Sequence, residues 1–170
     1  NGSFLVARNG QIIFEKYNGY ANKNEGTKIT AETPVQIASV SKVLTATAVL
    51  KLVNAGKLQL DQKVNTILKT FPYEDCTVRM LLTHRSGMRN YAYFTDHDKS
   101  VWDRHNQLTN KDILDILATK DIGLESKTGT RFGYCNTNYA MLALIIEKIT
   151  GLKYKEAMSE IIFKPLGMTH

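Results

Sequence analysis

Two segments of the chain, 41–54 and 136–150, predict helices with almost no polar face. Their apolar residues are Val43, Leu44, Ala46, Ala48, Val49, Leu50, Leu52 and Val53 in the first, and Ala140, Met141, Leu142, Ala143, Leu144, Ile145, Ile146 and Ile149 in the second. A helix that is apolar all round is normally buried. Gly56 and Gly151 follow the two segments as C-terminal stops. The fold must therefore cover two helices on nearly every side.

The N-terminal residues predict a β-hairpin. Phe4–Ala7 and Gln11–Tyr17 read as strands, and Asn9-Gly10 between them favours a type I′ turn, because both residues tolerate positive φ. Residues 18–33 read as a loop. An isolated hairpin is marginally stable at best, so this one needs further strands or covering helices. Its open edge is expected to pair with another chain or with a segment outside this sequence.

The remaining segments are mainly helical. Thr77 and Thr109 are expected to cap helices over 77–84 and 110–118, and a further helix is expected from Tyr154 to Pro165. Residues 61–71 predict a short helix or turn, whereas 89–106 and 123–133 read as irregular. A length of 170 residues suits one domain. The predicted class is α+β: the hairpin of an antiparallel sheet and a mainly helical region.

Composition excludes several function classes. The formal net charge is +6, but lysines and arginines are scattered, so no nucleic-acid partner is expected. No apolar run is long enough to span a bilayer. The four histidines and two cysteines have no metal-ligand spacing, so no metal is predicted. Whether Cys76 and Cys135 pair is undecidable from two cysteines.

Ser39-Val40-Ser41-Lys42 is the segment with the clearest chemistry. Ser39 and Lys42 are three residues apart at the start of a helix, so the ammonium can reach the hydroxyl. Burial and the positive end of the helix dipole both disfavour a charged lysine, and a neutral lysine can take the proton of a serine. The plainer alternative is that Ser39 caps the helix and Lys42 is solvated.

A second segment, Tyr134-Cys135-Asn136, precedes the second apolar helix. A tyrosine near a lysine can carry protons, and an asparagine can hold a substrate amide. Tyr20-Ala21-Asn22 has the same spacing, but it follows a predicted strand directly and is interpreted as structural.

Together these segments resemble the serine β-lactamase-related family, which includes class C β-lactamases, D-alanyl-D-alanine carboxypeptidases and esterases. The matching stretches occur in the family's order and cover nearly the whole chain. They are residues 37–42 (IASVSK), 81–88 (LLTHRSGM), 132–140 (FGYCNTNYA) and 163–168 (FKPLGM). The resemblance implies a β-lactamase/transpeptidase-like fold, of which 1–170 is an incomplete N-terminal part.

The resemblance also implies roles. Ser39 matches the acylated nucleophile, Lys42 its base, Tyr134 the proton shuttle to the leaving group, and Asn136 the substrate-binding asparagine. Residues 84, 86 and 87 match a stretch interpreted as structural. The substrate would be a small molecule or peptide with a scissile carbonyl, no cofactor would be needed, and the protein would be exported to the bacterial envelope.

Three departures from the family pattern matter. Lys127-Thr128-Gly129 has the letters of the family's third motif, but it precedes Tyr134 in a predicted loop and is interpreted as a coincidence. The family's domain continues further, with the remaining strands, the third motif and a second oxyanion donor. Cys135 stands inside the tyrosine motif and is interpreted as packing.

The sequence thus predicts a serine hydrolase that acts on an amide, β-lactam or ester carbonyl through an acyl-enzyme, with residues 1–170 alone inactive. One alternative is a non-catalytic homologue that binds peptidoglycan or acyl ligands, or regulates. A Ser-His-Asp hydrolase is disfavoured, because no G-x-S-x-G segment is present and nothing links His84 to Ser39. Arg85 and Arg89, which flank a Ser-Gly turn, predict a preference for anionic substrates.

Overall fold

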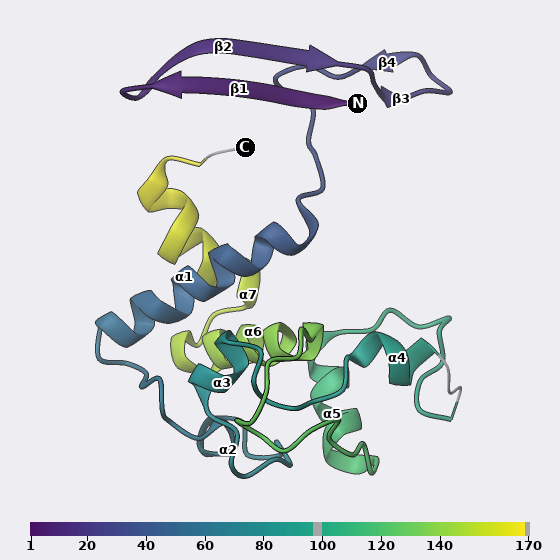
Figure 1. Cartoon of the computed structure of the whole chain (residues 1–170), viewed down its shortest axis with the longest axis vertical. Helices are drawn as coiled ribbons and strands as arrows, with labels where there is room; N and C mark the ends of the chain where they lie inside the picture. The colour runs from purple at the N-terminus through teal and green to yellow at the C-terminus, as the bar shows by residue number, and fades with distance from the viewer. Residues whose placement is uncertain (97–99, 169–170) are drawn as a thin grey trace. The chain divides into compact units, whose positions relative to one another are not determined.

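The computed structural model describes residues 1–96 and 100–168. The chain forms two compact units, Asn1–Ala38 and Ser39–His170. The strands belong to the first unit and the α-helices to the second (Figure 1). This combination confirms the predicted α+β class.

The first unit contains the predicted hairpin, with β1 over Gly2–Arg8 and β2 over Gln11–Asn18. The two strands are antiparallel, with a register shift between Val6 and Ala7. At the turn, Asn9 has φ 51° and Gly10 has φ 78°. Both values are positive, as a type I′ turn requires, so the prediction from Asn9-Gly10 is confirmed.

A second, smaller hairpin lies where the sequence predicted only a loop. β3 spans Tyr20–Asn22 and pairs antiparallel with β4, Thr27–Lys28. The Asn22 side chain accepts backbone N–H bonds from Asn24 at 3.0 Å and Glu25 at 3.4 Å, which stabilises the turn between these strands. Strands of two and three residues leave no alternation to read, which is why the prediction of a loop over 18–33 was wrong here.

The hairpin of β1 and β2 exposes apolar side chains on both faces. Phe4 and Leu5 are neighbours in β1 and so point to opposite faces, yet their exposed fractions are 61% and 55%. Ile12 and Ile13 repeat this in β2, with 58% and 61%. Strands that are apolar on both faces are typical of sheets covered on both sides.

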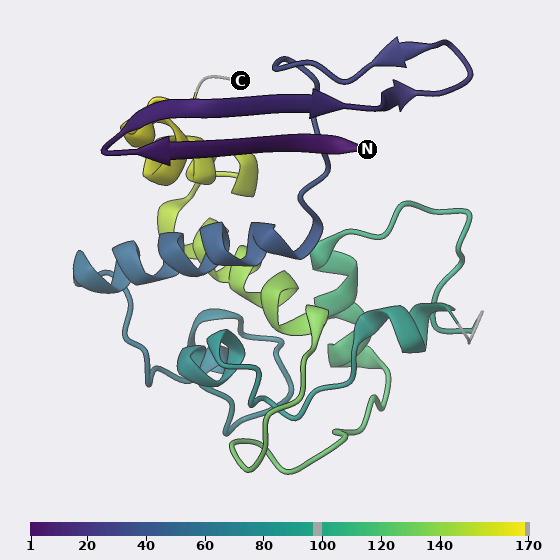
Figure 2. The same cartoon turned by 45° about the horizontal axis from the view of Figure 1, so that its top comes forward.

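The second unit is built around α6, Asn136–Thr150. This helix contacts α1 (Ser41–Asn54), α3 (Val78–Leu82), α4 (Tyr91–Asp96), α5 (Asn110–Thr119) and α7 (Tyr154–Met158). Figure 1 and Figure 2 both show α1 beside α6. The buried residues of α6 are Thr137, Asn138, Ala140, Met141, Leu142, Ala143, Ile145 and Ile146. Gly151 ends the helix at φ 72°, so both the burial and the C-terminal stop predicted for this helix are confirmed.

The first apolar helix, α1 (Ser41–Asn54), is buried on one side only. Ala48 and Val49 are fully buried, whereas Val43 is 65% exposed and Leu50 is 49% exposed. The prediction that this helix is buried all round is therefore wrong for the described residues. The reason is that its described helical neighbours, α6 and the 159–163 segment, leave these side chains uncovered.

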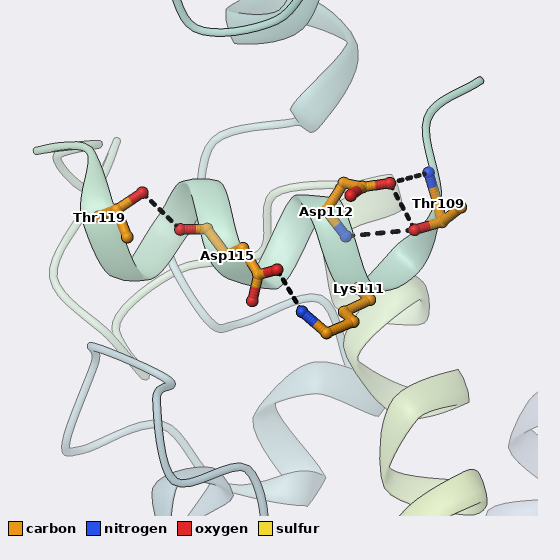
Figure 3. Close-up of polar contacts among 5 residues, drawn as sticks. All are labelled: Thr109, Lys111, Asp112, Asp115 and Thr119. Atoms are coloured by element: carbon orange, nitrogen blue, oxygen red, sulfur yellow. Dashed lines mark hydrogen bonds and ion pairs between the residues drawn. The ribbon is translucent and has the colours of Figure 1, made fainter. Parts of the chain in front are cut away.

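Short helices complete the second unit, and side-chain caps explain where two of them begin. α2 spans Val64–Ile67 and α3 spans Val78–Leu82. The Thr77 hydroxyl accepts the Met80 N–H at 3.3 Å, as predicted. Thr109 and Asp112 form a capping box at the start of α5, Asn110–Thr119 (Figure 3).

Two predictions about the helices need correction. The segment 89–106 is not wholly irregular, because it contains α4, Tyr91–Asp96; residues 97–99 of this segment lie outside the described residues. The last predicted helix runs without a break, as expected, but it is not α-helical throughout. It consists of α7 (Tyr154–Met158), a π-helical turn η2 (Ser159–Phe163) and a 3₁₀ turn η3 (Lys164–Leu166), and it ends before Gly167.

Candidate active site

Ser39 and Lys42 lie together at the start of α1. Ser39 is in a 3₁₀ turn, η1 (Ala38–Val40), and the Lys42 ammonium donates to Ser39 Oγ at 3.0 Å. The N-cap of α1 is Val40, and it makes no side-chain capping bond. Ser39 therefore does not cap this helix, and Lys42 is half-buried rather than fully solvated. The contact that the spacing predicted is present.

Tyr134 reaches the same serine from a loop 95 residues later. Its hydroxyl lies 2.7 Å from Ser39 Oγ, and either oxygen can donate. The Lys42 Nζ is 5.1 Å from the centre of the Tyr134 ring and 5.7 Å from that of Tyr139. The Lys42 ammonium and, after it, the Ser39 hydroxyl lower the pKa of Tyr134 below its ordinary value of 10.0. Both neighbours stabilise the phenolate, which favours proton release from this hydroxyl.

Asn136, the fourth predicted residue, is the first residue of α6 and is half-buried. Its carbonyl oxygen, Oδ1, is inaccessible to solvent and has no hydrogen-bond partner among the described residues. An unpaired buried acceptor costs about 1–3 kcal/mol. The oxygen is thus an unpaired acceptor, and a donor from outside would reach it only after the Asn136 side chain turns.

The loop that carries Tyr134 is fixed to residues 84–87 by three backbone bonds. The carbonyl oxygens of Gly87, Arg85 and His84 accept N–H bonds from Glu125, Gly129 and Gly133, each at 2.8 Å. Lys127-Thr128-Gly129 lies in this loop and ends in a turn, not in a strand, which agrees with its interpretation as a coincidental match. Tyr20, the other tyrosine with the motif spacing, lies in β3 of the first unit.

His84 has the most constrained environment near the site. It is a non-glycine residue at φ 54° and is only 9% exposed. Its Nδ1 lies 3.1 Å from both the Cys135 backbone nitrogen and the Asn138 side-chain nitrogen. Burial, followed by the nearby Lys42 charge, lowers the pKa of His84 below 6.5. The bonds found for His84 do not include Ser39, so the arrangement does not support a Ser-His dyad.

Both cysteines are free and buried. Burial raises the pKa of Cys76 to about 12 and also raises that of Cys135. Raised pKa values disfavour the thiolates, which agrees with the interpretation of Cys135 as packing rather than as a nucleophile. Within the residues that the structure describes, no helix is both long and apolar enough to cross a bilayer.

The fold and the Ser39, Lys42 and Tyr134 cluster define a protein of the serine β-lactamase-like class. The chain belongs to the Beta-lactamase family, whose model matches residues 1–170. It is 35% identical over 170 residues to Penicillin-binding protein 4* of Bacillus subtilis (strain 168), covering 99% of this chain and 37% of that protein. The chain therefore spans little more than a third of this relative.

Solved structures agree with this membership. The octameric penicillin-binding protein homologue from Pyrococcus abyssi is 34% identical with a TM-score of 0.83, and the match covers 98% of this chain and 39% of that one. The D-amino acid amidase from Ochrobactrum anthropi SV3, solved with D-phenylalanine, is 27% identical with a TM-score of 0.77, over 98% of this chain and 44% of that one. The predicted β-lactamase/transpeptidase-like fold is confirmed.

Sequence reasoning interpreted His84 as structural and found no link to the site. The structure places its ring centre 4.7 Å from that of Tyr134, with the planes tilted by 36°. One signal in the sequence could have indicated that His84 is buried. A histidine followed by Ser86-Gly87 at the end of a helix suggests a buried polar turn. Nothing in the sequence, however, indicates which loop the turn contacts.

Proposed function

We propose that the whole protein is a serine hydrolase that forms a covalent acyl-enzyme at Ser39. The observation that carries the proposal is the double contact of Ser39 Oγ, at 3.0 Å from Lys42 Nζ and 2.7 Å from the Tyr134 hydroxyl. A serine is a weak nucleophile until a neighbouring group takes its proton, and two such groups are within reach. The similarity to penicillin-binding proteins and to an amidase supports the same chemistry.

The proposed reaction has two halves. Ser39 Oγ attacks the carbonyl carbon of an amide, β-lactam or ester, while the Tyr134 phenolate, or Lys42 after it has given up its own proton, takes the serine proton. Tyr134 then returns a proton to the leaving nitrogen or oxygen as the bond to the acyl carbon breaks. Water or another acceptor attacks the acyl-enzyme, releases the acyl group and restores the Ser39 hydroxyl. No cofactor takes part.

Asn136 is proposed to bind the substrate. Its unpaired Oδ1 is an acceptor that would bond an amide N–H of a peptide or lactam substrate once the side chain turns to bring this buried atom to the substrate. Arg85 and Arg89 are both exposed and remain predicted to favour anionic substrates. Equal affinity for matched anionic and neutral analogues would contradict that prediction.

The test of the proposed function is covalent labelling of the whole protein. A fluorophosphonate and a penicillin are incubated with the wild type and with Ser39→Ala, and intact mass and peptide mapping locate the adduct. We expect one adduct, on Ser39, in the wild type alone. Turnover of a chromogenic lactam or short-chain ester is measured in parallel. Labelling without turnover would favour the ligand-binding alternative, and no labelling would refute the proposal.

Residues 1–170 alone are proposed to have little or no turnover, as part of a larger β-lactamase-like domain. The exposed apolar residues on both faces of the β1–β2 hairpin support this, because such strands normally belong to a covered sheet. The open edges are proposed to pair with another chain or with a further segment. Robust turnover by the isolated 170 residues would contradict the proposal.

An exported, envelope-associated location is also proposed, on the similarity to penicillin-binding proteins. Fractionation of the producing cells with an antibody to the whole protein tests it. Recovery in the cytoplasmic fraction alone would contradict the proposed location.

A further inference from the structure

A chain of hydrogen bonds with a fixed direction ends on His84. The Met88 N–H donates to Ser86 Oγ at 3.1 Å, so the Ser86 proton is free to bond Asn138 Oδ1 at 2.5 Å. This orients the Asn138 amide and turns its nitrogen, a donor, towards His84 Nδ1 at 3.1 Å. The Cys135 backbone N–H donates to the same Nδ1 at 3.1 Å.

These donors determine the protonation of the ring. A backbone N–H and an amide N–H can only donate, so Nδ1 must be unprotonated and accept both bonds. The proton of the neutral imidazole is therefore on Nε2. Burial lowers the pKa of His84, and the Lys42 charge acts in the same direction, so both favour the neutral ring.

His84 also holds Tyr134 from three directions. Its carbonyl oxygen accepts the Gly133 N–H at 2.8 Å, and its Nδ1 accepts the Cys135 N–H, so both chain neighbours of Tyr134 are bound by this one residue. The His84 ring packs against the Tyr134 ring, with 4.7 Å between their centres. The hydroxyl at the end of the Tyr134 side chain contacts Ser39.

We propose that His84 is the positioning residue for Tyr134, that it acts only as the neutral Nε2–H form, and that its protonation at acid pH disables the site. This rests on the proposed function of Tyr134 in acylation. A proton on Nδ1 would replace an acceptor by a donor that faces two other donors, and the bonds to Cys135 and Asn138 would be lost together. The cation would also lie near the Lys42 ammonium.

Among the described residues, four other ionisable side chains are found against the ring or acting on it. They are Lys42 from α1, Tyr134 and Cys135 from the loop before α6, and Tyr139 from α6, whose ring centre is 5.2 Å away. Within the described ranges, His84 forms no ion pair with a carboxylate that would stabilise its cation. An acid transition that depends on this histidine is therefore a result of burial and of nearby positive charge.

Three variants of the whole protein separate the contributions. His84→Asn places an amide oxygen near the position of Nδ1, cannot be protonated there, and suits the left-handed backbone, which asparagine tolerates. His84→Ala removes the acceptor and the ring. His105→Asn changes an exposed histidine and is the matched control.

The readout is the rate of Ser39 labelling by a fluorophosphonate between about pH 4 and 8, a range that spans the ordinary histidine pKa. We expect the wild-type and His105→Asn rates to fall about tenfold per pH unit below the His84 pKa. His84→Asn should lose part of the neutral rate, because it lacks the ring that packs against Tyr134, but it should also lose this acid limb, since its acceptor does not titrate. His84→Ala should lose at least about tenfold at every pH, because the loop bonds are absent.

Nitrogen-15 NMR of the imidazole rings gives a second readout, which does not depend on activity. We expect His84 to carry its proton on Nε2 at neutral pH and to gain the second proton only below pH ~6.5. An Nδ1–H tautomer, or an unchanged acid limb in His84→Asn, would overturn the inference. Circular dichroism shows whether His84→Ala folds. If the wild type is never labelled, the proposed function fails, while the NMR result still decides the state of His84.

Discussion

The close approach of two loops at Gly87 predicts a large loss of stability on substitution by alanine. Gly87 has φ 78°, and a Cβ built on it would lie 2.1 Å from the Ser126 carbonyl oxygen. The left-handed backbone alone costs an L-residue about 1–2 kcal/mol. The steric overlap requires the two loops to separate, and overpacking of this kind costs about 1–3 kcal/mol more. The bond from the Glu125 N–H to the Gly87 carbonyl, 2.8 Å long, would be strained as well.

Gly56→Ala is the matched control, because Gly56 has φ 69° but no atom within 4 Å of the position that a Cβ would occupy. It should lose only the backbone cost of about 1–2 kcal/mol. The free energy of unfolding in urea, measured for both variants of the whole protein, isolates the steric part as the difference. We expect Gly87→Ala to be less stable by a further ~1–3 kcal/mol and to label more slowly at Ser39. Equal losses in the two variants would refute the reasoning.

Further predictions concern the Thr109 hydroxyl, with its partner Asp112, and the Tyr134 hydroxyl. Thr109→Ala should lower the free energy of unfolding by about 1 kcal/mol, since the cap of α5 is lost, whereas Thr109→Ser should not. Hydrogen bonds from Thr109 lower the pKa of Asp112 from 3.8, so this carboxylate stabilises the fold at higher pH and the effect is lost as pH falls through the lowered pKa. Urea unfolding at several pH values tests both statements. An alanine variant as stable as the wild type would contradict the first, and a loss on substitution that is the same at acid and neutral pH would contradict the second. Tyr134→Phe should reduce kcat/KM by about 10²–10⁴-fold with little change in unfolding, because only the proton-carrying group is removed. An unchanged kcat/KM would exclude Tyr134 from proton transfer.

Local signals in the sequence were enough to predict most elements. Thr77 and Thr109 cap their helices as expected, and Gly151 ends α6, because each of these motifs depends on residues within one turn. The burial of α1 was overestimated. Periodicity shows that a helix has an apolar side, but whether a neighbour covers that side depends on residues far away in the sequence. The helix α4 was missed for the same reason: the Tyr91 N–H near its start bonds Thr137, 46 residues later.

The candidate site also has a part that the sequence predicted and a part that it could not predict. The contact of Ser39 with Lys42 follows from a spacing of three residues, and the involvement of Tyr134 was inferred from a family pattern. The role of His84 could not be inferred, because its bonds to Cys135 and Asn138 span 51 and 54 residues. A buried histidine is commonly a packed core residue, and only its geometry shows that it holds both neighbours of Tyr134.

The side chains of the candidate site are held in place by bonds within the protein. Ser39, Lys42 and Tyr134 are within hydrogen-bond distance, and His84 fixes the loop that carries the tyrosine. The Oδ1 atom of Asn136 is the exception, because it is buried and unpaired among the described residues, at a cost of about 1–3 kcal/mol. If the Asn136 side chain turned to offer this oxygen to a ligand N–H, the bond would remove the cost. The free energy recovered at Asn136 Oδ1 would then favour ligands that carry an amide N–H, two residues along the chain from Tyr134.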